Sequence, residues 1–134
     1  MQEEYTEETW PTQKWPNFSF REIACRETGL CFIDPDLMNR LQALRELCGF
    51  ALIVTSAYRS ATHTAERDKS IPGTHTQGLA VDIQVSGEDA YIVLVEALQM
   101  EFTGIGVQQK GEHRTRFLHL DISTAGARPT LFSY

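Results

Sequence analysis

The sequence predicts a single domain of the α+β class, in which helices pack on a small, mostly antiparallel sheet. The chain has 134 residues, enough for one hydrophobic core and too few for two ordinary domains. Hydrophobic residues make up 42% and charged residues 22% of the chain, which is the balance of a globular protein. The predicted elements follow the order helix, helix, strand, strand, helix, strand, strand, which is typical of α+β folds.

Two helices are predicted in the first half of the chain. The segment FSFREIACRETG predicts a short helix that opens near Ser19, with Glu22 three residues later as a capping box requires. In the next helix Asp34 is the N-cap and Pro35 occupies the first position. Leucines then recur at steps of three and four residues until Gly49, which predicts an amphipathic helix that packs on the core.

The remaining elements are strands and one further helix. The segment 51–60 is β-branched and apolar enough for a buried strand, and 79–85 reads as a second strand. Residues 88–100 carry an apolar stripe with helical spacing. Two short strands are expected over 104–107 and 116–122, joined by a polar turn.

We divide the chain into an acidic N-terminal arm, residues 1–16, and a single folded domain, residues 17–134. The arm holds four glutamates against one lysine, and two prolines interrupt any helix in it. It is expected to be loosely held, with Trp10 and Trp15 packed onto the surface of the domain. A sugar-stacking platform is the functional alternative for these two rings.

Charge and hydropathy limit the partners of the chain. The net charge of −6 has the wrong sign for binding a phosphate backbone or an anionic lipid surface, so neither nucleic acid nor membrane is expected as a partner. The start MQEEYTEETW is acidic where a secretory signal is basic and then apolar, which predicts a protein kept in the cytoplasm until something else releases it.

Three cysteines are an odd number and favour reduced thiols, although Cys25 and Cys31 could bridge if oxidised.

Three potential metal ligands lie near the predicted strands. His75 stands in a polar loop, Asp82 in the strand that follows it, and His119 in the segment FLHLDI. Two imidazoles and one carboxylate are the donors of a catalytic zinc site, which leaves a fourth position for water. The small residues Gly78 and Ala80 let the backbone pass close to whatever the ligands hold. The pattern therefore predicts a Zn²⁺ site.

A second carboxylate and a cation are expected beside this site. Strand periodicity places Asp121 on the same side as His119, where it can take a proton from a metal-bound water or orient a ligand. Arg59 follows the buried strand and can clamp a substrate carboxylate or a developing oxyanion. Each residue also has an ordinary structural alternative, such as a core histidine for His119 and a surface ion pair for Arg59.

The same stretches resemble the motifs of a known family. TSAYRS, GTHTQGLAVDI and FLHLD are similar to the motifs of the M15 zinc peptidases, in their small phage-type and D-alanyl-D-alanine carboxypeptidase-like branch. These motifs are S/T-x-Y-R-S, S-x-H-x-x-G-x-A-x-D and H-x-D. The similarity extends upstream and covers residues 17 to about 122. The resemblance implies a zinc cleft on a fold like that of D-Ala-D-Ala peptidases and hedgehog signalling domains.

Carried over residue by residue, the resemblance implies three zinc ligands, namely His75, Asp82 and His119. It implies Arg59 as the contact to substrate or oxyanion, with His63 and Tyr58 as further residues on the substrate side. Some relatives place a glutamate or aspartate three residues before the last histidine ligand. Arg116 stands at that position here, so Asp121 is the candidate for the general base.

The resemblance further implies a phage endolysin-like enzyme that hydrolyses a peptide bond in the stem peptide of bacterial peptidoglycan. We expect a monomeric L-alanyl-D-glutamate endopeptidase that acts on the wall after release from the host cytoplasm, with a D-alanyl-D-alanine carboxypeptidase as the alternative. A non-catalytic, zinc-stabilised binding or virion-structural domain is the rival from another class. A thiol hydrolase that uses Cys25 or Cys31 is a weaker rival.

Overall fold

The computed structural model describes residues 1–134 and has the predicted α+β fold. Its main sheet has five strands in the order β3-β4-β6-β5-β7. These strands are β3 (Ile53–Ser56), β4 (Ala80–Gln84), β5 (Gly104–Gln108), β6 (Phe117–Asp121) and β7 (Thr130–Ser133). All neighbouring strands are antiparallel except β5 and β7, which run parallel. The prediction of a small, mostly antiparallel sheet is therefore confirmed.

The helices begin and end at the predicted caps. Ser19 and Glu22 bond to each other's backbone N–H groups and so close a capping box before α1 (Phe20–Ile23). Asp34 caps the second helix, and Gly49 ends it with a left-handed φ of 75°. The bounds of the two long helices are α2 (Pro35–Cys48) and α3 (Gly87–Gln99), the latter one residue earlier at each end than predicted.

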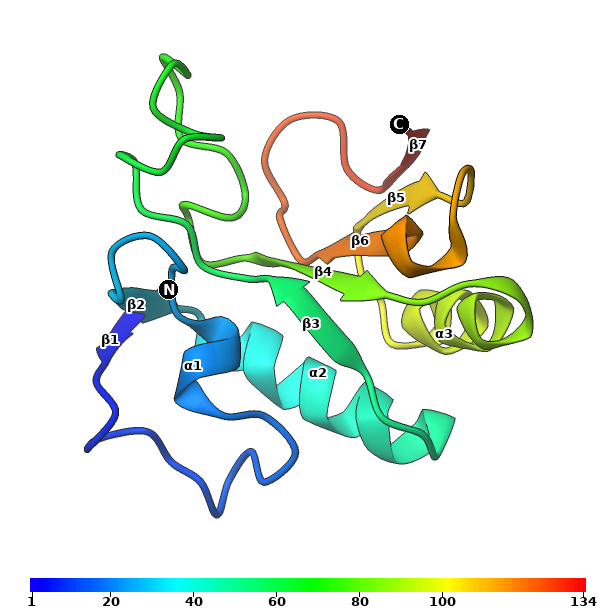
Figure 1. The fold of residues 1–134 in the computed structure, drawn as a ribbon, viewed down its shortest axis with the longest axis horizontal. Coiled ribbons are helices and arrows are strands. Elements are labelled where there is room, and N and C mark those ends of the chain that lie inside the picture. Colours follow the sequence, from blue (N-terminus) through cyan, green and yellow to red (C-terminus); the bar gives the residue numbers. More distant parts are fainter.

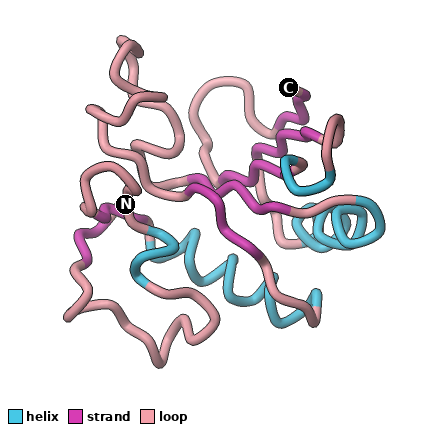
Figure 2. Tube along the Cα trace, in the orientation of Figure 1, coloured by secondary structure: helices cyan, strands magenta, loops and turns pink.

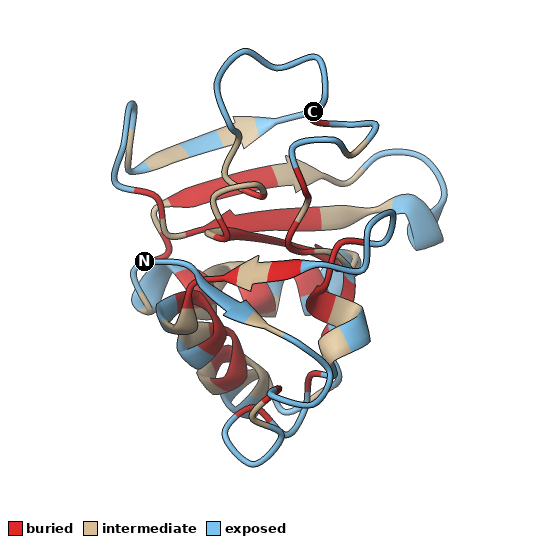
Figure 3. Cartoon of the chain, turned by 90° about the vertical axis from the view of Figure 1, so that its left-hand side faces the viewer, coloured by how far each residue is buried: buried red, intermediate tan, exposed pale blue.

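The two faces of the sheet differ in their chemistry. Helices α2 and α3 lie on one side of the sheet, whereas the long loops 57–79 and 122–129 extend on the other side (Figures 1 and 2). The side chains buried in the hydrophobic core include Val81, Ile83, Ile105, Leu118 and Leu120. Successive strand residues point to opposite faces, so the intervening polar residues of β4 and β6 face the loops. Figure 3 shows that the central strands are the most buried.

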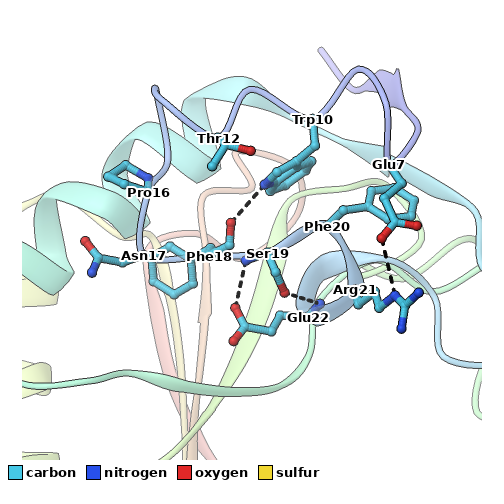
Figure 4. A pocket seen from close by; sticks show the side chains of 10 residues that line it. All are labelled: Glu7, Trp10, Thr12, Pro16, Asn17, Phe18, Ser19, Phe20, Arg21 and Glu22. Carbon is cyan, nitrogen blue, oxygen red and sulfur yellow. Dashed lines mark hydrogen bonds and ion pairs between the residues drawn. The ribbon is translucent and has the colours of Figure 1, made fainter.

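The N-terminal segment is not the loosely held arm that the sequence predicts. Its strand β1 (Glu3–Tyr5) pairs with β2 (Cys31–Ile33) in a separate two-stranded sheet. Trp10 and Trp15 are buried with their ring centroids 5.1 Å apart, and Trp10 Nε1 donates to the Phe18 carbonyl at 2.8 Å (Figure 4). The two aromatic rings anchor the segment, and their burial leaves no platform for stacking a sugar.

Two further expectations need correction. The sequence predicts a buried strand over 51–60, but only Ile53–Ser56 (β3) forms a strand there, and it lies at the edge of the sheet with Ile53 and Thr55 exposed. No strands are predicted from the sequence at the positions of β1, β2 and β7.

The three cysteines are free thiols. None of the helices combines the length and the apolar character that crossing a membrane requires.

Gly104 on β5 gives a test of how closely the sheet is packed at the site. A Cβ atom at this position would collide with the carboxylate of Asp121, which is fully buried. We expect Gly104→Ala to lower the free energy of unfolding by about 2–3 kcal/mol, because the strand or the carboxylate must move within a packed interior. Urea unfolding of the two proteins measures this loss. A loss below about 0.5 kcal/mol would show that this carboxylate is not held where the structure places it.

Candidate metal centre

Neighbouring strands bring the candidate ligands to one place. Asp82 on β4 and His119 on β6 are directly paired, so their side chains project from the same face of the sheet. His75 comes from the loop before β4, which turns at Gly78 with a φ of 73°. A Cβ at Gly78 would collide with the carbonyl of Phe32, so this close approach requires glycine.

The three side chains converge closely enough to share one ion. One donor atom from each of His75, Asp82 and His119 lies within 4.8 Å of the other two, and all three residues are buried. Asp82 Oδ1 is 3.3 Å from His75 Nε2 and 3.1 Å from His119 Nδ1. The structure thus brings together the residues that the sequence proposed as metal ligands.

In each histidine, the ring nitrogen that does not face Asp82 contacts a hydrogen-bond acceptor. His75 Nδ1 lies 2.7 Å from the Ala57 carbonyl, so it carries the proton and leaves Nε2 free to ligate. His119 Nε2 lies 2.8 Å from Asp121 Oδ2, which leaves Nδ1 facing Asp82. Histidines that bind metals commonly donate their second N–H to a carbonyl or carboxylate in this way. The donor set and its orientation therefore fit a divalent cation such as Zn²⁺.

The electrostatics of the site favour a bound positive charge. Burial opposes ionisation of Asp82, but hydrogen bonds from His119 and His75 outweigh it and hold the pKa of this carboxyl well below its ordinary value. Burial also opposes protonation of His119, but hydrogen bonds to Asp121 and Asp82 outweigh it and raise the pKa of the imidazole. A proton or a metal ion therefore stabilises the cluster.

Arg59 holds the second oxygen of the carboxylate ligand. Its Nη2 donates to Asp82 Oδ2 at 3.3 Å, its Nη1 to Glu66 Oε2 at 3.1 Å and its Nε to Ser56 Oγ at 2.9 Å. The oxygens of Asp82 are thereby divided, because Oδ1 faces the imidazoles and Oδ2 faces the guanidinium group. One N–H on each terminal nitrogen of Arg59 is left for another acceptor.

Asp121 lies behind His119 and is engaged through both oxygens. It accepts from Arg128 Nε at 3.0 Å and Nη2 at 2.8 Å, and from the Ser123 backbone N–H at 3.1 Å. Burial opposes its ionisation, but hydrogen bonds from His119 and Arg128 outweigh it and lower the pKa of this carboxyl to about 2. Of the two roles that spacing leaves open, this geometry supports the orientation of His119.

Three other residues considered from the sequence have their contacts elsewhere. The ring of Tyr58 is buried in the core, 5.6 Å from the ring of Phe32. His63 Nε2 lies 3.2 Å from a carboxylate oxygen of Glu27. The guanidinium of Arg116 donates to a carbonyl in the preceding turn, so the position three residues before His119 supplies no acid.

Several residues at the site were missed by sequence reasoning. Glu66 is buried and accepts from Arg59, from Lys69 Nζ at 3.0 Å and from Thr76 Oγ1 at 3.3 Å. The ring of Phe132 lies 5.4 Å from the ring of His119. A single acid in a polar loop and a phenylalanine near the end of the chain carry no local signal of such contacts.

The comparison with protein families agrees with this site. A family model described as Peptidase M15 matches residues 16–121. The chain belongs to the M15 peptidase family. The match contains all three candidate ligands, Arg59 and Asp121, and it ends before β7. No curated protein and no solved structure matches the chain.

Membership of the M15 family indicates which class of reaction the candidate metal centre serves. M15 peptidases are metal-dependent hydrolases of peptide bonds, so the chain is assigned to the metallopeptidases. Among its side chains, His75, Asp82 and His119 form the His/Cys/Asp/Glu cluster with ligand spacing. These three residues are therefore the candidate ligands of an M15 peptidase.

Proposed function

We propose that the chain is a zinc-dependent peptidoglycan hydrolase, with the L-alanyl-D-glutamate bond of the stem peptide as its first candidate substrate. One observation carries this proposal: two imidazoles and one carboxylate converge within 4.8 Å in a member of the M15 family. Three such ligands suit Zn²⁺ and leave a coordination position open. The substrate class rests on the similarity of the TSAYRS, GTHTQGLAVDI and FLHLD motifs to those of peptidoglycan peptidases.

The residues of the site have separate tasks in this proposal. When bound, the metal ion supplies Lewis acidity and an acidified water molecule. The two remaining N–H groups of Arg59 are placed beside Asp82, where they can donate to a substrate carbonyl as negative charge develops on its oxygen. Asp121 fixes the ring of His119, and Glu66 fixes the guanidinium of Arg59.

In this proposal the substrate is held by contacts around the metal centre. The net charge of −6 disfavours electrostatic docking of this chain onto an anionic cell wall. In this proposal the chain acts as a monomer on stem peptides, without nucleic acid or membrane, after release from the cytoplasm of a phage-infected host.

A non-catalytic binding domain is the second candidate. It is favoured by one observation, which is that no carboxylate at the site is free to accept a proton. Asp121 is engaged by Arg128 and His119, and Glu66 by Arg59 and Lys69. A protein of this kind would bind the metal and the wall without cutting it.

Digestion of purified peptidoglycan tests the proposal. We expect zinc-loaded protein to release stem peptides with D-glutamate at their new amino terminus, detected by mass spectrometry, and expect chelation to stop the reaction. His75→Ala should abolish the release, whereas replacement of the exposed His113 should not. Release of free D-alanine would identify the carboxypeptidase alternative. Metal binding without any cleavage would favour the binding domain and contradict the proposed hydrolysis.

A further inference from the structure

A row of paired residues crosses the sheet at the metal centre. Asp82, His119, Gly106 and Phe132 occupy corresponding positions on β4, β6, β5 and β7. Paired residues share a face, so the row lies on the side of the sheet that carries the site. Gly106 contributes no side chain, and the ring of Phe132 takes this space, since a Cβ at Gly106 would collide with it.

Tyr134 lies on the same face, two residues beyond Phe132. Its backbone N–H donates to the Val107 carbonyl at 3.3 Å, which extends the pairing of β7 with β5. Its ring centroid is 5.7 Å from that of Phe132 and 5.0 Å from that of Phe117. Its Cε2 atom lies 3.0 Å from the position that a Cβ of Gly106 would occupy. The phenol ring is therefore held against the site face of the sheet.

The hydroxyl group of Tyr134 is available to a ligand. The residue is 56% exposed, and its ring is held by aromatic contacts rather than through a hydrogen bond of the hydroxyl. Partial burial of the ring raises the pKa of Tyr134 to about 12; the negative charge of Asp82 adds to this effect, and the positive charge of Arg59 opposes it. The phenol therefore keeps its proton at neutral pH and can act as a hydrogen-bond donor.

The strand order places this donor opposite Arg59. Arg59 follows β3 at one end of the order β3-β4-β6-β5-β7, and Tyr134 follows β7 at the other end. The ligands Asp82 and His119 stand on the strands between them. The family match ends at residue 121, so Tyr134 belongs to a part of the chain outside that match.

We propose that Tyr134 is a substrate-contacting residue whose phenolic O–H donates a hydrogen bond to an oxygen of the bound peptide, on the side of the metal centre opposite Arg59. The inference rests on the proposed function, because it requires a peptide in the site. A neutral donor suits a carbonyl or carboxylate oxygen, and stem peptides present both. Tyr134 then lies at one end of the peptide-binding site along the sheet, and Arg59 lies at the other end.

Removal of one hydroxyl group tests this inference. Tyr134→Phe keeps the ring contacts, and Tyr91→Phe, at an exposed position on α3, is the matched control. We expect Tyr134→Phe to lower kcat/KM for stem peptide about tenfold. We also expect it to weaken, by a similar factor, the binding of a phosphinate analogue of the scissile L-alanyl-D-glutamate unit to zinc-loaded protein, as measured by calorimetry. Zinc affinity and Tm should not change, and Tyr91→Phe should change none of these quantities.

The two readouts separate this inference from the proposed function. If the native protein cleaves stem peptide and Tyr134→Phe matches it in both cleavage and analogue binding, the inference fails and the proposed function stands. If the native protein binds the analogue through Tyr134 but does not cleave peptide, the contact stands and the proposed hydrolysis fails. A native protein that does not bind the analogue at all contradicts the inference.

Discussion

Asp82→Ala is expected to abolish specific metal binding and to lower peptidase activity by more than about 100-fold. Loss of a residue that only supports a ligand typically costs 10–100-fold, so loss of a ligand itself should cost more. Asp82 is the one carboxylate among the three candidate ligands, and its Oδ1 contacts both imidazoles. Its removal also leaves the guanidinium of Arg59 without one of its two anionic partners. Calorimetric zinc titration and peptide cleavage measure the two effects.

Two further variants show whether the effect is specific to this carboxylate. Asp82→Asn keeps the shape of the side chain and removes its charge, so it should lose most of the metal affinity while the fold is retained. Asp89→Asn, in the first turn of α3, makes the same chemical change on the surface and should leave metal binding unchanged. Native metal affinity in Asp82→Ala would exclude this carboxylate as a ligand.

The second large effect is expected for Asp121→Asn, which should weaken metal affinity about 10–100-fold and lower stability by about 2 kcal/mol. The loss of affinity follows because an amide cannot orient His119 as a carboxylate does. Residues that hydrogen-bond to a metal ligand typically contribute 10–100-fold to metal affinity. The loss of stability follows because Arg128 keeps its charge but loses its bidentate partner. Zinc titration and urea unfolding at pH 7 measure the two quantities.

The dependence of stability on pH distinguishes this charge effect from a packing effect. Because the pKa of Asp121 is lowered from 3.8 to about 2, its contribution is complete above pH 4 and is lost as the pH falls toward 2. The native, metal-free protein should therefore lose about 2 kcal/mol more than Asp121→Asn over this interval. Parallel acid curves for the two proteins would contradict the role of this carboxylate in the fold.

Local signals in the sequence were sufficient for the long helices and for the shared face of His119 and Asp121. The caps at Asp34 and Gly49 depend on a few neighbouring residues, so they can be recognised without knowledge of the tertiary structure. The same holds for the alternation in FLHLD, which places His119 and Asp121 on one face. The convergence of His75 with these residues followed from the family resemblance and from the small residues before Asp82.

Contacts between distant parts of the chain were not predictable in this way. Strands β1 and β2 are only three residues each, too short to show a period, and they form by pairing with each other. The orienting role of Asp121 depends on Arg128, which comes from the loop 122–129 that follows β6. The proximity of Phe132 and His119 depends on the parallel pairing of β7 with β5.

The most direct test of the metal centre is zinc titration of the metal-free protein, followed by X-ray absorption spectroscopy of the product. The structure predicts one ion per chain, bound by two imidazole nitrogens and one carboxylate oxygen at about 2.0–2.2 Å. Absence of tight binding, or a coordination shell that contains sulfur from a cysteine, would contradict the assignment of His75, Asp82 and His119 as the metal ligands.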